Sequence, residues 1–271
     1  MIQDLGYRSE FRLSEKKHHY GSHIHLLDDP YATQVLNRFS QASVSQPEAN
    51  RLVTQLYKFL LQQSANTFWP RVSSGTKTRM LNQTANAHFE GEVFNLKVRA
   101  VVVDLMRAGI LPTQVCFEAL HDILAPADIR QDHILINRKT NDQGEVIGVN
   151  ISGHKIGGPF DNSYVFIPDP MGATGSSMRG VIELLEKFQG GAALKFIGLH
   201  LIVTPEYLKS IEPLKDRLEI FTLRLDRGLS SKEVLSSIPG THWDQEKGLT
   251  DNDYIVPGAG GVGEILNNSF V

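Results

Sequence analysis

The run Tyr164-Val165-Phe166-Ile167 contains no charged or amide side chain, and it constrains the fold more than any other feature of the chain. A strand that is apolar on both faces has to be covered on both faces, as in a parallel sheet with helices on either side. Short apolar runs of this kind recur along the chain and alternate with segments of helical periodicity. We therefore expect the α/β class with a parallel sheet.

This alternation predicts the positions of the individual elements. Strands are expected over 98–103, 133–136, 146–151, 164–167, 194–203 and 218–223. Helices are expected over 28–42, from a capping box at 45–48 onward, from Pro112 to Leu124, over 176–188 and over 205–211. Asp28 and Asp29 are expected to cap the first of these helices. Turns are expected at 141–144 and at Gly190-Gly191, and the polar stretch 66–96 is interpreted as an irregular arm with one short strand.

The 271 residues are interpreted as one domain over 25–271 behind a polar N-terminal arm over 1–24. That first stretch and its border contain the four histidines His18, His19, His23 and His25. They lack cysteine partners and the spacing of a structural zinc site, so a solvated arm is preferred to a metal site.

Composition excludes several classes of protein. Lys and Arg number 27 against 30 Asp and Glu, and a net charge of −3 gives no electrostatic footprint for nucleic acid. No apolar run is long enough to span a membrane, and the stretch Met1 to Leu13 does not resemble a signal peptide. The one cysteine, Cys116, is expected to be a buried small hydrophobe and suits a reducing compartment. We expect a cytoplasmic protein without nucleic-acid or membrane partners.

The segment that carries chemistry joins the buried strand to the helix predicted after it. Its small residues let the backbone approach an anion, and the free N–H groups at a helix start favour phosphate. An acid at the carboxyl end of a central strand lies where open α/β sheets place ligands, and it can accept hydrogen bonds from sugar hydroxyls. Together they predict a ribose 5-phosphate site, the alternative being an ordinary strand-to-helix turn. The residues concerned are Asp169, Pro170, Met171, Gly172, Ala173, Thr174, Gly175, Ser176 and Ser177.

This segment, DPMGATGSS, resembles the phosphoribosyl-pyrophosphate (PRPP) loop of uracil phosphoribosyltransferases, which usually reads DPMLATGGS. Three more resemblances follow in the same order as in that family. Arg107-Ala108-Gly109 is similar to its RAG, 134–138 to its strand ending in YRD, and 254–260 to its YIVPGLG. The resemblance extends from about 25 to 265. It implies a parallel-sheet fold of the type I phosphoribosyltransferases, with an N-terminal helical segment and an irregular arm.

The resemblance also implies a reaction and its participants. PRPP and uracil would give UMP and pyrophosphate in pyrimidine salvage, with Mg²⁺ as cofactor and no resident metal site. Arg107 and Arg138 would contact PRPP, since the planar guanidinium binds phosphate oxygens in pairs; the alternative for each is a surface or ion-pairing arginine. A homodimer or higher oligomer, exchange of arms between subunits and a nucleotide effector such as GTP are further implications.

In the same family, uracil is read by the backbone of a loop near the C-terminus. Residues 254–264 correspond to this loop, and the residues that would read the base are Ile255, Gly260, Gly261 and Val262. The alternative is a C-terminal strand that ends in a flexible glycine tail.

The chain departs from the family pattern mainly at this loop. Where the family reads GLGDAGDR, the two acids are replaced by Gly261 and Glu264, and the arginine by Ile265. The segment 231–252 also looks longer than usual, and its Thr241-His242-Trp243 has no assigned role. A second hypothesis is therefore a PRPP- or nucleotide-binding regulator, or a catalytically weak paralogue, on the same fold.

Overall fold

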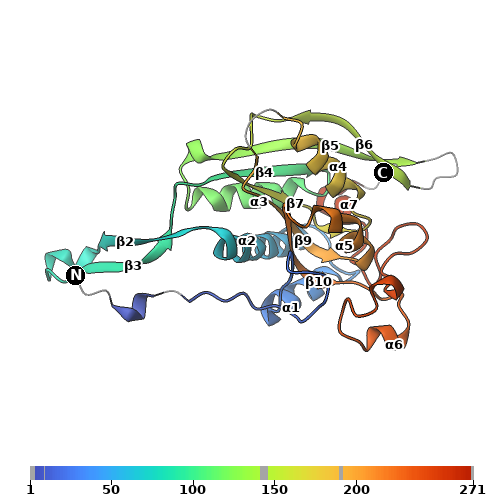
Figure 1. Ribbon diagram of the computed structural model, residues 1–271, viewed down its shortest axis with the longest axis horizontal. Helices are drawn as coiled ribbons and strands as arrows, with labels where there is room; N and C mark the ends of the chain where they lie inside the picture. Colours follow the sequence, from blue (N-terminus) through green and yellow to red (C-terminus); the bar gives the residue numbers. More distant parts are fainter. Residues whose placement is uncertain (1–3, 9, 141–145, 189–191, 270–271) are drawn as a thin grey trace.

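The computed structural model describes residues 4–8, 10–140, 146–188 and 192–269. Their main sheet has eight strands in the order β1-β10-β9-β7-β4-β5-β6, with the short β8 also paired to β9 (Figure 1). Every pair in this sheet is parallel except β5 with β6. The parallel α/β fold is thereby confirmed. The strands are β1 (Ile24–Leu26), β4 (Arg99–Met106), β5 (Ile129–Thr140), β6 (Val146–Lys155), β7 (Ser163–Pro168), β8 (Met171–Gly172), β9 (Lys195–Val203) and β10 (Leu218–Leu225).

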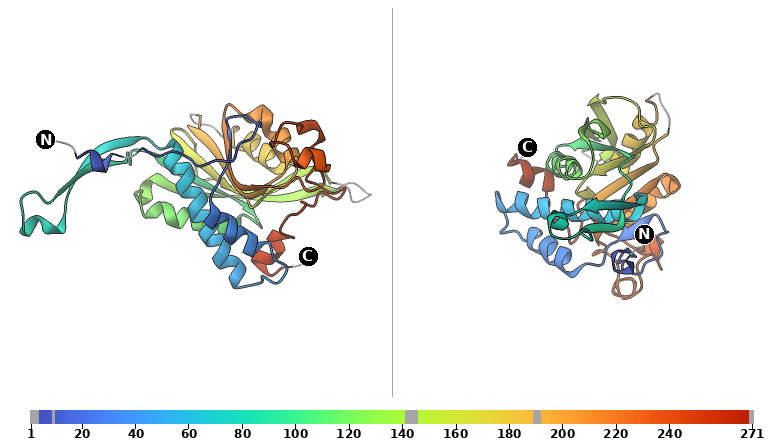
Figure 2. Two further views of the ribbon diagram at one scale, coloured as in Figure 1. Left: turned by 90° about the horizontal axis from the view of Figure 1, so that it is seen from below. Right: turned by 90° about the vertical axis from the view of Figure 1, so that its left-hand side faces the viewer.

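Helices cover both faces of the sheet, as the all-apolar strand requires (Figure 2). Along β4, Ala100 and Val102 belong to one hydrophobic cluster, and Val101 and Val103 belong to a second cluster on the other face. The first cluster also receives α1 (Pro30–Phe39), α2 (Glu48–Phe68), α3 (Ile110–His121) and α7 (Val262–Asn267), and the second receives α4 (Ser176–Leu185) and α5 (Pro205–Ile211). No helix in the described ranges combines the length and hydropathy needed to cross a membrane.

The segment 66–96 is more regular than its sequence predicts. Helix α2 continues to Phe68, and β2 (Arg71–Lys77) then pairs antiparallel with β3 (His88–Phe94) in a separate two-stranded sheet. This hairpin projects from the body of the molecule, and the N-terminal segment runs beside it (Figures 1 and 2). The expectation of an irregular arm was wrong because the β2–β3 hairpin is largely exposed, which leaves it without the apolar periodicity of a strand.

The helix starts follow the predictions only in part. Asp29 caps α1 by accepting a hydrogen bond from the Ala32 N–H at 2.7 Å. The capping box at 45–48 does not form, because no side chain caps α2 and Glu48 pairs instead with Arg38 at 2.8 Å. Helix α3 begins at Ile110, two residues before the predicted Pro112.

Part of the N-terminal arm is packed into the core. Tyr20 and His23 are buried, and His25 stacks on Phe221 at 4.3 Å between ring centres. His25 also pairs with Glu219 at 3.2 Å, so the expectation of solvated histidines was wrong for His23 and His25. Cys116 is fully buried, as expected. The turns predicted at 141–144 and Gly190-Gly191 lie outside the described residues.

The unassigned segment 231–252 packs against this arm and contains α6 (Lys232–Leu235). The Trp243 indole donates to the Pro205 carbonyl at 3.0 Å, and its ring meets the edge of Tyr20. Glu246 accepts a hydrogen bond from the Tyr20 hydroxyl and pairs with Arg227 at 2.8 Å. The segment therefore connects the arm to Arg227, just beyond the carboxyl end of β10, because Glu246 contacts both Tyr20 and Arg227. The 3₁₀ turns are Leu5–Tyr7, Arg79–Asn82, Pro126–Asp128, Glu212–Leu214 and Trp243–Gln245.

Candidate functional site

The strand order changes direction between β4 and β7. From β4 the chain passes through α3 to β5 on one side, whereas β7, β9 and β10 follow one another on the other side. Ligands of open α/β sheets bind at the carboxyl ends of the strands at such a point. Arg107 directly follows β4 and Asp169 directly follows β7, so two of the predicted site residues lie at this edge of the sheet.

The segment 169–177, here called the phosphate loop, turns from β7 into α4 along the end of β9. The Pro170 carbonyl accepts hydrogen bonds from the N–H groups of Leu201 and Ile202, at 3.0 and 3.2 Å. Gly175 then adopts a φ of 80°, which favours glycine, and leads directly into α4. All nine residues that the sequence assigns to this loop therefore lie in one compact turn.

Several N–H groups of the phosphate loop are free to bind an anion. Among the described residues, no hydrogen-bond acceptor faces the N–H groups of Thr174, Gly175, Ser177 and Met178. The Thr174 hydroxyl lies 3.2 Å from that of Ser176, which adds two hydroxyl groups to the same turn. Free N–H groups at the start of a ten-residue helix form an arrangement that suits phosphate.

Asp169 is the acid of the phosphate loop and is half-buried. Desolvation raises the pKa of its carboxyl to about 6, and a hydrogen bond from the Met171 N–H opposes that rise. Its backbone is fixed at both ends, since its N–H donates to the Leu199 carbonyl and its carbonyl accepts from His200 Nδ1 at 2.5 Å. A carboxylate held in this way can accept hydrogen bonds from a ligand's hydroxyl groups.

The two predicted arginines lie toward the same edge. Arg107 is exposed and donates to the Ser269 hydroxyl at 2.9 Å, and its carbonyl accepts from the Asn267 amide. Arg138 lies in β5 opposite Val149 of β6. Since the pairing of β4 with β5 ends at Met106 and Leu135, Arg138 extends beyond the carboxyl end of β4.

The loop 254–264 is anchored to the end of β10. The Gly258 N–H donates to Asp226 Oδ2 at 2.7 Å, and the Gly258 carbonyl accepts from Arg224 at 2.8 Å. Arg224 and Asp226 also pair with each other at 2.6 Å. The loop is therefore a braced turn that leads into α7, and the alternative of a C-terminal strand with a glycine tail is wrong.

The residues predicted to read the base differ in their exposure to solvent. Ile255 is half-buried, Gly260 and Gly261 are exposed, and the Val262 side chain is buried in the first hydrophobic cluster. A Cβ atom on Gly263 would lie 3.6 Å from the Ala108 Cβ, so the end of this loop adjoins the turn that contains Arg107. Val262 can contribute to a site only through its backbone.

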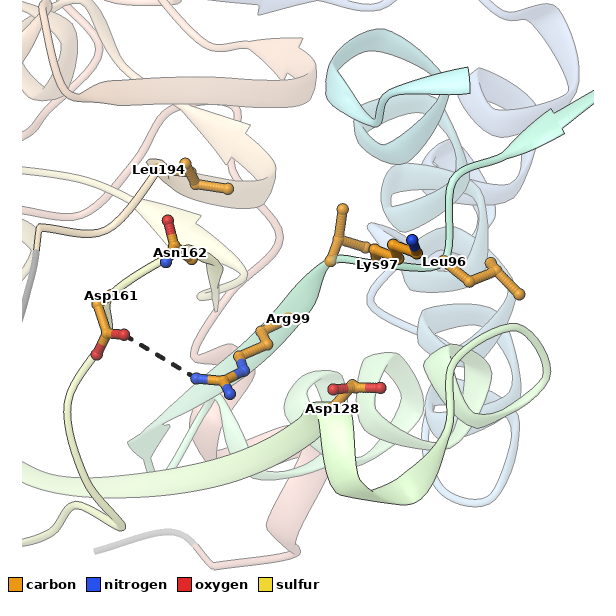
Figure 3. A pocket seen from close by; sticks show the side chains of 8 residues that line it. Leu96, Lys97, Arg99, Asp128, Asp161, Asn162 and Leu194 are labelled. Carbon is orange, nitrogen blue, oxygen red and sulfur yellow. Dashed lines mark ion pairs between the residues drawn. The ribbon is translucent and has the colours of Figure 1, made fainter. Parts of the chain in front are cut away.

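A cavity of about 630 Å³ lies at the opposite edge of the sheet (Figure 3). Its lining residues precede or begin the strands β4, β5, β7 and β9, so the cavity is at their amino ends. Arg99 and Asp161 face each other there at 4.0 Å and offset each other's charge. Since the turns with free N–H groups lie at the carboxyl ends, we place the functional site there and not in this cavity. The lining residues are Leu96, Lys97, Val98, Arg99, Asp128, Asp161, Asn162 and Leu194.

Comparison with known proteins decides the family. A family model described as uracil phosphoribosyltransferase matches residues 26–242, which include Arg107, Arg138 and the phosphate loop. The chain belongs to the uracil phosphoribosyltransferase family. This membership confirms the resemblance expected from the sequence motifs. The chain is a transferase enzyme, and phosphoribosyl transfer is its class of reaction.

Individual relatives agree with this assignment. Uracil phosphoribosyltransferase 1 of Schizosaccharomyces pombe is 31% identical over 182 residues, or 66% of this chain and 67% of that protein. The uracil phosphoribosyltransferase of Streptococcus salivarius is 33% identical over 106 residues, which are 39% of this chain and 40% of that protein. The AQ2163 protein of Aquifex aeolicus has the same fold, with a TM-score of 0.66 and 21% identity over 90% of this chain and 97% of that one.

The departure from the family pattern at Gly261 has a local structural context. Gly261 directly precedes α7, and the Glu264 carboxylate occupies the space that a Cβ atom on residue 261 would take. A side chain at 261 would therefore have to displace Glu264. The loop 254–264 lies outside the residues matched by the uracil phosphoribosyltransferase family model.

Four residues that support the phosphate loop or the loop 254–264 were not assigned a role from the sequence. His200 and Tyr207 lie behind the loop, and Arg224 and Asp226 brace the loop 254–264. A histidine inside the apolar run 194–203 was the one available signal, because a buried polar side chain needs a partner. The pattern alone does not identify that partner.

Proposed function

We propose that this transferase moves the phosphoribosyl group of PRPP to uracil and forms UMP and pyrophosphate. The observation that carries the proposal is the phosphate loop, whose free N–H groups and Asp169 lie together at the point where the strand order reverses. Uracil as the base is supported by the names of the relatives and by the family of the chain.

Each part of PRPP has a group of suitable chemistry at the site. The N–H groups of the phosphate loop would hold the 5′-phosphate, and Asp169 would accept hydrogen bonds from the ribose hydroxyls. Arg107 and Arg138 would bind the pyrophosphate. The backbone of Ile255, Gly260, Gly261 and Val262 would read the donor and acceptor edge of uracil.

The proposed reaction breaks the bond between C1′ and the pyrophosphate oxygen and forms a bond from C1′ to the uracil nitrogen, which loses its proton. Positive charge develops on the ribose as the pyrophosphate leaves. Positioning and charge stabilisation then supply most of the catalysis. The phosphate loop and Asp169 would contribute by holding the 5′-phosphate and the ribose hydroxyls, and so by fixing the position of C1′.

Mg²⁺ fits this site as an ion that arrives with its substrate. In the described ranges, no group of three or more His, Cys, Asp or Glu side chains is placed to hold a metal. Mg²⁺ often binds through one carboxylate together with substrate phosphates and waters. Asp169 would supply that carboxylate, and the bound ion would offset the charge of the pyrophosphate.

Other properties of the family extend the proposal. A homodimer or higher oligomer, a cytoplasmic location and a nucleotide effector such as GTP are part of it. Uracil and PRPP are the small-molecule partners, and neither nucleic acid nor a membrane is included.

A direct assay tests the proposed reaction. Purified protein with PRPP, uracil and Mg²⁺ should form UMP, measured by chromatography alongside the other pyrimidine and purine bases. Asp169→Asn should lower kcat/KM for PRPP about ten- to a hundredfold, the range for loss of hydrogen bonds to a charged group. Asp161→Asn at the other end of β7 is the matched control and should leave it unchanged. No product with any base would refute the proposal.

The second candidate is a PRPP- or nucleotide-binding regulator, which the replacement of a family acid by Gly261 favours. Calorimetry with PRPP separates the two: binding without turnover supports the regulator, and binding with turnover supports the enzyme. The single variant Gly261→Asp restores the acid, since the atoms that a side chain at 261 would meet are the far end of the flexible Glu264 side chain. A rise in turnover in that variant would show that the missing acid limits the reaction.

A further inference from the structure

A buried histidine and tyrosine lie directly behind the phosphate loop. His200 of β9 and Tyr207 of α5 are 0% and 2% exposed. His200 Nδ1 lies 2.5 Å from the Asp169 carbonyl, and His200 Nε2 lies 2.7 Å from the Tyr207 hydroxyl. Because a carbonyl only accepts, Nδ1 carries the proton and Nε2 accepts the hydrogen of the tyrosine. The pair therefore forms a directed chain that ends on the backbone of Asp169.

The backbone N–H of Tyr207 supports the loop a second time, through the side chain of Thr204. The Tyr207 N–H donates to Thr204 Oγ1 at 3.0 Å, which leaves the Thr204 hydroxyl hydrogen for the Ala173 carbonyl at 2.6 Å. The Thr204 N–H also donates to the Gly172 carbonyl at 3.0 Å. Side chain and backbone of the junction between β9 and α5 thus fix successive carbonyl groups of the loop.

Fixing these carbonyls fixes the direction of the N–H groups. In a trans peptide the carbonyl and the following N–H point in opposite directions. The Pro170 carbonyl points to β9, and the Met171 N–H accordingly reaches the Asp169 carboxyl. Likewise, the Ala173 carbonyl points to the Thr204 hydroxyl, so the Thr174 N–H points away from Thr204. The Thr174 N–H is therefore directed outward by the support behind the loop, whereas the Asp169 carbonyl held by His200 precedes Pro170, which has no N–H, so that this bond fixes Asp169 itself.

The fit between α5 and the loop is close. A Cβ atom on Gly172 would lie 3.0 Å from the Tyr207 ring, and one on Gly175 would lie 2.8 Å from the Ser210 side chain. Such distances leave no space for a larger residue at either glycine. The loop therefore lies directly against α5.

We propose that His200 and Tyr207 are positioning residues that fix the backbone of Asp169, and with it the carboxyl group that would bind the ribose hydroxyls, and thereby determine the affinity of the site for the ribose 5-phosphate end of the substrate. The proposal rests on the proposed function for the identity of the ligand. Neither side chain touches the substrate: His200 acts through the backbone of Asp169, and Tyr207 acts through His200.

Three variants separate positioning from a general loss of packing. Tyr207→Phe deletes only the hydroxyl. His200→Leu removes the donor to Asp169, whereas the amide of His200→Asn can donate in place of Nδ1. Both His200 variants leave the Tyr207 hydroxyl without its acceptor. The difference between their affinities for ribose 5-phosphate therefore reports the hydrogen bond to the Asp169 carbonyl. Tyr164→Phe is the control, because it deletes a hydroxyl bonded to the Phe68 carbonyl at the amino end of β7.

The readouts are ribose 5-phosphate binding by calorimetry, the KM values for PRPP and uracil, and the melting temperature. Tyr207→Phe should weaken ribose 5-phosphate binding about tenfold, the usual effect of one buried hydrogen bond. His200→Leu should bind at least as weakly as Tyr207→Phe, and His200→Asn should bind more tightly than His200→Leu. The KM for PRPP should rise while the KM for uracil stays within twofold, and Tyr164→Phe should match the wild type.

The proposal is overturned if the variants bind ribose 5-phosphate as the wild type does, whatever their melting temperatures. It is also overturned if His200→Asn and His200→Leu are equal, or if the wild type does not bind ribose 5-phosphate at millimolar concentration. Wild-type binding without formation of UMP counts against the proposed reaction only, because binding of ribose 5-phosphate tests the positioning by itself.

Discussion

At the scale of single residues, the buried surroundings of His200 disfavour protonation of its neutral imidazole ring. Burial lowers the pKa of His200 to about 4, from an ordinary value of 6.5. Between these values the unfolded chain binds more protons than the folded one, so stability falls as the pH falls. From pH 7 to pH 5 this amounts to about 2 kcal/mol of unfolding free energy. Urea denaturation of the wild type and of His200→Asn at both pH values measures it.

Asp169 also changes the stability of the folded chain with pH, in the direction opposite to that of His200. The comparison of the wild type with His200→Asn allows for this contribution. Burial raises the pKa of Asp169 to about 6, so the folded chain binds that proton more tightly and gains stability as the pH falls through 6 toward 4. Asp169 is present in both proteins, and their difference therefore reports His200. An equal pH dependence of the two proteins would contradict the prediction.

Residue patterns predicted the strand-to-helix connection at 169–177, which the structure contains, because its residue types are visible in the sequence. A strand, an acid, small residues and hydroxyls occur in one uninterrupted stretch, Asp169 to Ser177. The support behind the loop comes from Thr204 and Tyr207, about 30 positions later. Periodicity predicts that such residues are buried, but it does not predict which backbone group each one contacts.

At the scale of elements, the segment 231–252 depends on one buried ion pair. Arg227 and Glu246 have side chains that are 10% and 0% exposed, and Arg227 also donates to the carbonyls of Val234, Leu235 and Ser237. Removing one member of such a pair leaves a buried charge alone. Arg227→Met should therefore lower the unfolding free energy by about 3–5 kcal/mol.

An exposed pair in the same region provides the control. Lys209 and Asp244 lie 2.5 Å apart with side chains that are 62% and 87% exposed. Lys209→Met should change the unfolding free energy by at most about 1 kcal/mol, since exposed pairs contribute little. Equal losses in the two variants, measured by urea denaturation, would show that the buried pair has no special role.

At the scale of the whole molecule, the β2–β3 hairpin is the part with least support of its own. Isolated two-stranded hairpins are marginal in water, and this one exposes the apolar side chains of Val72, Met80, Leu81 and Val93. We expect a second subunit to cover it. Light scattering of the full chain should give the mass of a dimer or a larger oligomer. A chain in which a short Gly-Ser linker replaces residues 73–92 should form an oligomer with fewer subunits. A monomeric full chain would contradict this expectation.

The apolar runs of the chain predict the class of the fold but not its complete arrangement. Apolar runs such as 164–167 require cover on both faces, which settles the layers and the parallel sheet. The antiparallel pairing of β5 with β6 and the hairpin depend on contacts that leave little apolar periodicity. The order of the strands is likewise a property of the connections and not of any single run.

Because Cys116 is buried, a cysteine introduced at the surface can be labelled selectively by a thiol reagent. The chain has one cysteine, and it is fully enclosed in the core. A cysteine introduced at Asn162, in the cavity at the amino edge, would therefore be the one thiol open to a maleimide dye. The six residues of β7 separate that position from the phosphate loop by about 20 Å at 3.3 Å per residue. Such a dye would leave the ligand edge free, and its energy transfer to a fluorescent nucleotide would measure occupancy of the site directly.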